Sequence, residues 1–305
     1  MPELPEVETV RLQLKHKVIG KTIASVGVFH MKTVDHNSDF ENVLKGKVFA
    51  DIDRVGKLLI FSFKNEPELF ILAHLKMTGQ FFYKDKNGQL VGGGHSPSGH
   101  FHFSSRSAPE KLGPMTAADR ELPGRHTRVA FNFTDRSSLF FNDMRLFGYT
   151  KLADSEAVAK ARGSFGPEPI NAAFDTAWFT EKVRTRKAAI KAVLLDQKFI
   201  AGLGNIYVDE ALWRAKVKPM RLASTLTKKE ALAIAMHSGA VMNESIKVGG
   251  TTFQHFVDAE GNAGNFTQNL QVFGKQKTPC PRCKTLIEKT RVAGRGTHFC
   301  PKCQK

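Results

Sequence analysis

The chain ends in two short cysteine motifs, Cys280-Pro-Arg-Cys283 and Cys300-Pro-Lys-Cys303, which contain all of its cysteines. Each motif can present two thiolates, and four thiolates complete the tetrahedral coordination of Zn²⁺ without an open position. We therefore predict one zinc ion with a structural role, held by Cys280, Cys283, Cys300 and Cys303. A redox pair or a chance spacing is the alternative, and the repetition of the motif in a short basic tail argues against it.

The segment between the two motifs, residues 284–299, fits a β-hairpin whose turn contains Gly294-Arg295-Gly296. A piece of this size is too small for a core of its own, so metal binding would fold it. The hairpin would then hold Arg295 outward. Arg295 alone could equally be a solvated turn residue, but on a strongly basic protein a phosphate contact is favoured.

The charge of the chain indicates a polyanionic partner. Lys and Arg total 45 against 29 Asp and Glu, which gives a net charge of +16 over 305 residues. Such an excess favours nucleic acid, although basic charge can also serve solubility. Because neither a signal peptide nor a bilayer-spanning apolar stretch is apparent, we expect no membrane association and a cytoplasmic location.

Hydrophobic periodicity divides the chain into a mostly β part and a helical part. The first part begins with a predicted helix over residues 5–20. Strand patterns follow, over residues 26–29, 57–63, 69–72, 80–83, 128–133 and 138–142. Residues 88–125, rich in Gly, His, Ser and Pro, predict a long loop. After a hinge at residues 165–170, helical patterns cover residues 188–195, 205–215 and 228–247.

A glycine-rich stretch, Gly202-Leu-Gly-Asn205-Ile-Tyr-Val-Asp-Glu210, opens one of these predicted helices. Exposed backbone N–H groups at such a helix terminus bind phosphate well. Asn205 stands at or near the N-cap, and plain capping is its alternative role.

Six distinctive strings follow one another along the chain. They are Pro2-Glu-Leu-Pro-Glu-Val-Glu8, His74-Leu-Lys-Met-Thr-Gly79, Asp143-Met-Arg-Leu-Phe-Gly148, Gly166-Pro-Glu-Pro169, the stretch from Gly202 to Glu210, and Gly294-Arg-Gly-Thr-His-Phe-Cys300. Taken in this order, they resemble bacterial formamidopyrimidine-DNA glycosylases from end to end of the chain, apart from the loop at 88–125. The related endonuclease VIII branch is less similar, since it usually opens with Pro-Glu-Gly-Pro-Glu.

The resemblance implies an α+β, multidomain fold. It would comprise an N-terminal catalytic β-sandwich with flanking helices (residues 1–150), a hinge (151–170), a helix–two-turns–helix DNA-binding domain (171–269) and a zinc finger (270–305). It also implies a monomer that binds double-stranded DNA containing oxidised bases, associated with the nucleoid, and Zn²⁺ as the one cofactor.

The same resemblance implies a bifunctional glycosylase and abasic-site lyase. After removal of Met1, the amine of Pro2 would attack C1′ of the damaged nucleotide and form a Schiff base, followed by β,δ-elimination. Glu3 would protonate the sugar ring oxygen, with Glu6 as an acidic partner and Lys57 as a catalytic, phosphate-binding lysine. Alternatively, Glu3, Glu6 and Glu8 only stabilise a helix N-terminus, by about 0.3–1 kcal/mol, and Lys57 is solvated.

Three further residues match the family's void-filling group, which replaces an everted base: Met77, Arg145 and Phe147. Core packing is the alternative for Met77 and Phe147. His74 and Asn205 would join Lys57 and Arg295 in gripping the bent DNA backbone.

Two departures from the family leave the lesion class open. The segment 88–125 is longer than usual and carries His95, His100 and His102, which could bind a metal or belong to a polar loop. His255 stands where an acidic residue is frequent. We expect oxidised purines such as 8-oxoguanine as substrates. The alternatives are oxidised pyrimidines, a catalytically silent DNA-binding protein, or a ribosomal or transcriptional zinc protein.

Overall fold

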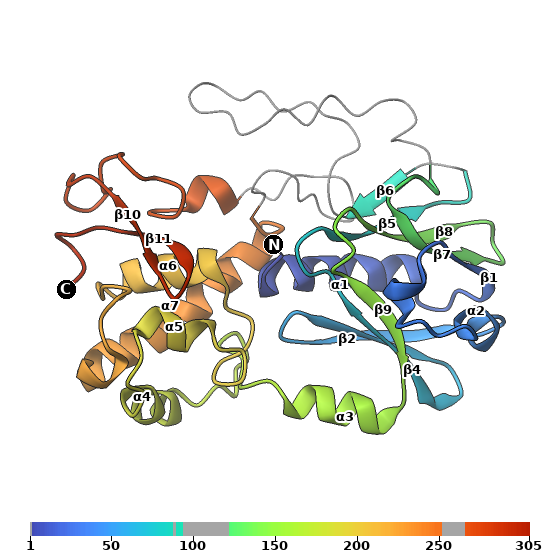
Figure 1. The fold of residues 1–305 in the computed structure, drawn as a ribbon, viewed down its shortest axis with the longest axis horizontal. Helices are drawn as coiled ribbons and strands as arrows, with labels where there is room; N and C mark the ends of the chain where they lie inside the picture. Colours follow the sequence, from blue (N-terminus) through green and yellow to red (C-terminus); the bar gives the residue numbers. More distant parts are fainter. Residues whose placement is uncertain (1, 88–89, 94–121, 252–265) are drawn as a thin grey trace.

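The computed structural model describes residues 2–87, 90–93, 122–251 and 266–305 (Figure 1). Met1, the three histidines of the 88–125 segment and His255 lie outside the described residues, so the predictions about them are not tested. No helix in the described part of the chain is both long and apolar enough to cross a membrane.

The N-terminal half is a sandwich of two antiparallel sheets. One sheet has the strand order β1-β7-β8-β5-β6 and the other β2-β3-β4-β9. The strands are β1 (Ile23–Val28), β2 (Phe49–Val55), β3 (Leu58–Phe63), β4 (Glu66–His74), β5 (Gly79–Lys84), β6 (Leu90–Gly93), β7 (Thr127–Phe133), β8 (Ser138–Asp143) and β9 (Tyr149–Ala153). The flanking helices are α1 (Leu4–Val18), η1 (Met31–Val34), α2 (Phe40–Leu44) and α3 (Ser155–Gly163).

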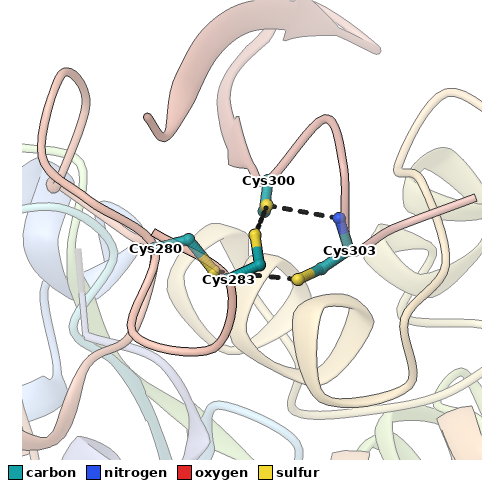
Figure 2. Close-up of side chains that lie close together, drawn as sticks. All are labelled: Cys280, Cys283, Cys300 and Cys303. Carbon is teal, nitrogen blue, oxygen red and sulfur yellow. Dashed lines mark hydrogen bonds between the residues drawn. The ribbon is translucent and has the colours of Figure 1, made fainter. Parts of the chain in front are cut away.

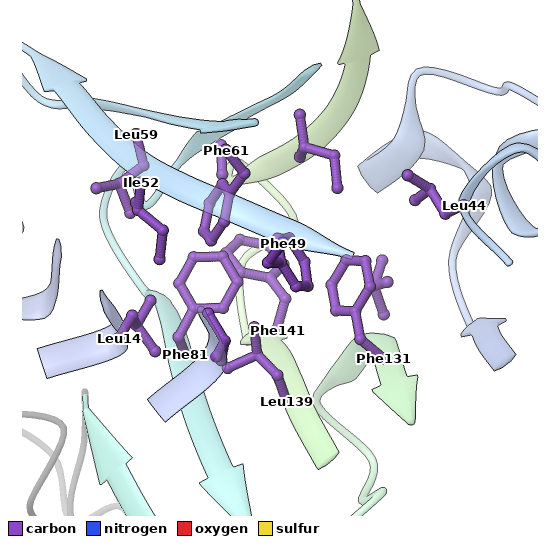
Figure 3. Packing of buried hydrophobic residues seen from close by; sticks show 14 of the residues in the cluster. Leu14, Leu44, Phe49, Ile52, Leu59, Phe61, Phe81, Phe131, Leu139 and Phe141 are labelled. Carbon is purple, nitrogen blue, oxygen red and sulfur yellow. The ribbon is translucent and has the colours of Figure 1, made fainter. Parts of the chain in front are cut away.

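Aromatic side chains join the two sheets (Figure 3). Phe49 of β2 meets Phe131 of β7 with ring centroids 6.2 Å apart, and Phe61 of β3 meets Phe81 of β5 at 5.7 Å. All four rings are almost fully buried. Burial of large aromatic surfaces is the main force that holds two such layers together. The predicted β-sandwich is therefore confirmed.

The C-terminal half is helical and ends in a two-stranded hairpin. Its elements are α4 (Thr176–Arg184), α5 (Ile190–Leu195), α6 (Asn205–Arg214), η3 (Ala223–Thr225), α7 (Lys228–Lys247), η4 (Phe266–Asn269), β10 (Glu288–Val292) and β11 (Arg295–Phe299). A capping box formed by Thr227 and Glu230 begins α7, as the sequence predicts.

Helix α1 belongs to both halves. Leu4, in its first turn, is part of the helical core. Val7, Val10 and Leu14 pack into the sandwich core. Figure 1 shows α1 running from the sandwich to the helical half, with the N-terminus between them. The start of the chain therefore lies at the junction of the two halves.

Most predicted elements are observed, but four details differ. Residues 88–125, predicted as a loop, include β6, which pairs with β5. Strands β2 and β9 lack a predicted counterpart because polar residues interrupt their apolar pattern. Residues 151–170, predicted as a hinge, contain α3 and part of β9. The hairpin turn is Ala293-Gly294, so Arg295 is the first residue of β11 and not a turn residue. The exact domain boundaries stay a prediction.

Candidate active site

Glu3 is buried where the two halves meet. It is the N-cap of α1 and only 3% exposed. Its carboxylate also accepts hydrogen bonds from the first amides of α6, from Ile206 N at 2.9 Å and Tyr207 N at 3.4 Å. The N–H groups that the sequence suggested for phosphate binding are thus partly taken by a carboxylate of the same chain.

The N-cap of α6 is Gly204, so Asn205 lies next to the N-cap, as the sequence predicted, but it is not the capping residue. A Cβ atom at Gly204 would lie 2.2 Å from Cδ of Glu3. Only glycine therefore lets the carboxyl of Glu3 approach the helix terminus this closely. The Asn205 side chain turns instead to the hairpin, where Nδ2 donates to Gly296 O at 2.9 Å.

Burial raises the pKa of Glu3 from 4.5 to about 7, with Lys57 opposing the shift and Glu6 adding to it. A carboxyl group with this pKa is protonated in a large fraction of molecules near neutral pH. It can therefore donate a proton at a pH where an ordinary glutamate cannot.

Glu6 holds the backbone around Glu3 in place. One oxygen, Oε2, accepts from Glu3 N at 2.8 Å. The other, Oε1, accepts from Thr251 N at 2.8 Å and from the Tyr207 hydroxyl. Burial and then Glu6 raise the pKa of Tyr207 well above its usual value, so the hydroxyl stays a donor. Tyr207 is a residue of this network that sequence reasoning did not single out.

Lys57 is buried beside these carboxylates. It is 6% exposed, and its Nζ donates to Leu203 O at 2.9 Å. Burial lowers the pKa of Lys57, while Glu3 and Glu6 oppose this shift. The alternative of a solvated lysine is therefore wrong. Pro2, partly exposed, directly precedes Glu3 in the chain.

An ion-pair network that the sequence did not predict fixes the turn before Lys57. Arg54 forms two hydrogen bonds with Glu168, at 2.7 and 2.8 Å, and a third with Glu8 at 2.8 Å. Glu168 also accepts from Gly56 N at 2.6 Å. Glu168 belongs to the Gly166-Pro-Glu-Pro169 string, so the family resemblance marked this residue, although not its ion pair. The network ties the sandwich to the hinge.

A buried pair behind α6 holds the hairpin. Lys191 Nζ donates to Asp209 Oδ1 at 2.6 Å and to Gly296 O at 3.3 Å. Asp209 also accepts from His298 N at 2.8 Å. Lys191 and Asp209 are fully buried. This pair, also missed from sequence, sets β11 against α6, so that Asn205 and the exposed Arg295 are carried by joined elements.

The predicted void-filling residues lie on two turns at the ends of sandwich strands. Met77 follows β4 and is 42% exposed, and Phe147 follows β8 and is 49% exposed. Arg145 stacks over the ring of Phe147 with its guanidinium carbon 4.8 Å from the centroid. Because both apolar side chains are exposed, core packing is excluded for them.

His74, at the end of β4, is a neutral donor. Its Nδ1 accepts from Lys76 N at 2.9 Å, which leaves the proton on Nε2. Burial, with Lys76 and Lys57 nearby, lowers the pKa of His74 from 6.5 to about 3. An Nε2–H group of this kind can hydrogen-bond a phosphate oxygen without carrying charge.

The four cysteines converge from both ends of the hairpin (Figure 2). The Sγ atoms of Cys280 and Cys303 are 3.9 Å apart, and those of Cys283 and Cys300 are 3.5 Å apart. A tetrahedron with Zn–S bonds of about 2.3 Å has edges of about 3.8 Å. The four sulfurs, all within 4.8 Å of one another, therefore fit one zinc ion and leave no position for catalysis.

A β-sandwich and a helical domain that meet around a buried carboxyl group, with a four-cysteine hairpin set against the helical domain, define a zinc-finger protein of the helix–two-turns–helix class. Three family models match in sequence order: the formamidopyrimidine-DNA glycosylase N-terminal domain over residues 1–150, its H2TH domain over 165–257, and the zinc finger found in FPG and IleRS over 278–305.

Known proteins agree with these matches. The formamidopyrimidine-DNA glycosylase of Lactiplantibacillus plantarum is 40% identical over 99% of this chain and 98% of its own. A structure of MutM with carbocyclic 8-oxo-G containing DNA has 32% identity and a TM-score of 0.79 over both whole chains. Lactococcus lactis Fpg with an oxidized pyrimidine containing DNA gives the same values. The chain belongs to the formamidopyrimidine-DNA glycosylase family.

Proposed function

We propose that the chain is a bifunctional DNA glycosylase and abasic-site lyase that removes oxidised purines from duplex DNA. The observation that carries this proposal is the buried carboxyl of Glu3, with a pKa near 7, directly after Pro2 and beside Lys57. The enzyme would act as a monomer on nucleoid DNA in the bacterial cytoplasm.

The first chemical step would be attack of the Pro2 amine, freed by removal of Met1, on C1′ of the damaged nucleotide. The glycosidic bond breaks, and the base leaves with the proton that the Pro2 nitrogen loses when it bonds to C1′. The C1′–O4′ bond also breaks, and Glu3 delivers its proton to O4′, which leaves an iminium between Pro2 and C1′. Glu6 acts on this step indirectly, because it holds the backbone N–H of Glu3.

The iminium is an electron sink, so it acidifies the proton on C2′. Loss of this proton expels the 3′ phosphate, and a second elimination expels the 5′ phosphate. Lys57, His74, Asn205 and Arg295 would bind the flanking phosphates. Lys57 and Arg295 would do so by charge, and the other two by neutral N–H groups.

The void-filling residues explain how a base could leave the helix. Extruding a nucleotide leaves a gap and an orphan base, which an apolar wedge and an arginine can occupy. Met77, Phe147 and Arg145 supply these groups on exposed turns.

Oxidised purines are the favoured substrate class, since a relative of this fold has been solved with carbocyclic 8-oxo-G containing DNA. Oxidised pyrimidines are the second candidate, because Lactococcus lactis Fpg has been solved with such DNA. A silent DNA-binding protein would have no need of a carboxyl with a raised pKa beside Pro2 and a buried lysine.

The test is base release and strand cleavage on four matched duplexes, containing 8-oxoguanine opposite cytosine, an oxidised pyrimidine, an abasic site or no lesion. We expect release of 8-oxoguanine and cleavage at both flanking phosphates. Preference for the pyrimidine duplex would reassign the substrate class, and inactivity on all four would refute the proposed enzymatic activity.

The affinity for duplex DNA should fall steeply as the salt concentration rises, because each phosphate contact releases counterions. An affinity that does not change with salt would contradict the proposed phosphate contacts.

A further inference from the structure

The two turns that carry the void-filling residues share one buried carboxylate. Asp143 ends β8 and is 1% exposed. Its Oδ1 accepts from the Thr78 hydroxyl on the first turn. On the second turn, Oδ1 accepts from Arg145 N at 3.1 Å, and Oδ2 accepts from Gly148 N at 2.6 Å. The Thr78 hydroxyl oxygen also accepts from Arg145 N, at 3.2 Å, so the two turns are bonded directly as well.

These hydrogen bonds matter because they hold the backbone from which the exposed side chains project. Met77 and Phe147 are about half exposed, so the backbone of each turn decides where they project. Each turn also contains a non-glycine residue in the left-handed region, Lys76 at φ 50° and Leu146 at φ 56°. Such conformations persist only where surrounding contacts impose them, and they are common at functional sites.

Close packing leaves each turn little freedom to relax. A Cβ atom at Gly79 would lie 2.5 Å from Leu75 O. One at Gly148 would lie 2.8 Å from the Phe141 ring and 3.1 Å from Oδ2 of Asp143. The backbone of Asp143 is also fixed, because Arg128 Nε donates a hydrogen bond to Asp143 O at 2.7 Å.

We propose that Asp143 is a positioning residue for base eversion, which locks the Met77 turn and the Arg145–Phe147 turn into one unit that enters the DNA together. Asp143 does not reach the reacting atoms. It acts through the Thr78 hydroxyl on one turn and the Arg145 and Gly148 amides on the other. This inference rests on the proposed function, because it assigns the purpose of the lock to the removal of an intact base.

The variants are Asp143→Asn and Thr78→Val. The amide of Asp143→Asn offers one acceptor oxygen in place of two, so it cannot keep the hydrogen bonds of Oδ1 to Thr78 and Arg145 together with that of Oδ2 to Gly148. Thr78→Val removes only the link between them. The matched control is Asp135→Asn, at the other end of β8, where Asp135 accepts hydrogen bonds from Ser137 N and Oγ in an ordinary strand turn.

The first measurement is hydrogen exchange of the free protein. Asp143→Asn and Thr78→Val should raise exchange at residues 75–79 and at 144–148, while Asp135→Asn should leave both turns unchanged. If neither Asp143→Asn changes exchange at residues 75–79 nor Thr78→Val changes it at residues 144–148, the lock does not exist. This result is independent of activity, so it separates failure of the lock from failure of the proposed function.

The second measurement compares single-turnover release of 8-oxoguanine with cleavage of an abasic-site duplex, which has no lesion base to extrude. We expect Asp143→Asn to slow base release about 10-fold or more and to weaken the preference for the opposite base. Abasic-site cleavage should change less than about 3-fold, since the chemistry is untouched. An equal loss on both duplexes would show a merely structural role and overturn the proposal.

Discussion

The sandwich and the helical half present their candidate functional residues in opposite ways. The sandwich has an aromatic core and places Met77 and Phe147 on exposed turns. The helical half buries three charged groups, Lys191, Asp209 and Glu210, whose hydrogen bonds fix the surrounding backbone. The side chains that we propose to enter the DNA are therefore exposed, whereas the groups that fix the backbone of the site are enclosed. Glu3 and Glu6 lie on α1, which belongs to both halves.

The largest expected effect follows loss of zinc, because zinc binding to such sites contributes about 10–16 kcal/mol of apparent free energy. In Cys300→Ser, or after chelation, the amides of β10 and β11 should lose protection from hydrogen exchange. Those of β7 and β8 should keep it, since the sandwich core contains no cysteine. A hairpin that stays protected without metal would contradict a structural role for zinc.

The second-largest effect is expected when the buried ion pair between Lys191 and Asp209 is broken. Lys191→Ala should destabilise the protein by about 3–5 kcal/mol in urea unfolding, because it leaves Asp209 buried without its counter-charge. Arg214→Ala is the control. It breaks an ion pair with the half-exposed Glu244 and should lose no more than about 1 kcal/mol.

A double variant sharpens this comparison. Lys191→Met with Asp209→Asn leaves no buried charge, and the Asn oxygen can still accept from His298 N. It should be more stable than Lys191→Ala. If the double variant is the less stable of the two, the uncompensated charge is not the source of the loss.

The pH dependence of base release tests whether Glu3 is the proton donor, and here a smaller effect is expected. Its pKa in the folded protein is about 7, so the proton it must donate is lost above that pH. Single-turnover base release should therefore fall about tenfold per pH unit at alkaline pH. Glu3→Gln should be slow and lack this limb. A wild-type profile that stays flat from pH 7 to 9 would exclude Glu3 as the acid.

The same pKa has a consequence for stability. Because the folded state binds this proton more tightly than the unfolded chain, the contribution of Glu3 to stability falls as pH rises from 4.5 to about 7. Glu3→Gln should remove that part of the dependence, as measured by urea unfolding at several pH values. An identical pH dependence in the variant would contradict the raised pKa.

The smallest effect is expected at the exposed turns. Phe147→Ala should change the free energy of unfolding by no more than about 0.5 kcal/mol while it slows base release. Phe141→Ala, on β8 of the same sheet and fully buried, should lose about 3–5 kcal/mol. Similar losses in the two variants would mean that Phe147 supports the fold and not the DNA contact.

The features that follow from local spacing were predictable from the sequence. Helix α7 has the predicted bounds, and the four cysteines converge as their motifs indicate. Strand β2 was missed because Asp51, Asp53 and Arg54 break its apolar alternation, although Phe49 and Ile52 are fully buried.

The contacts that define the site could not be predicted, because they join distant parts of the chain. Glu3 reaches the amides of α6, and Arg54 reaches Glu168. The family resemblance named Glu3 and Lys57 but left open whether they are buried. It also gave no sign that Gly204, and not Asn205, caps α6 beside Glu3. Such pairings depend on the tertiary fold and not on local propensity.

The most direct test of the account is borohydride trapping on duplexes with 8-oxoguanine opposite cytosine and with an abasic site, followed by mass mapping of the adduct. The protein must carry zinc and lack Met1. We predict a covalent adduct on the nitrogen of Pro2, which disappears in Pro2→Gly with a blocked N-terminus. No adduct on either duplex, or an adduct on a lysine such as Lys57 in place of Pro2, would contradict the proposed amine mechanism.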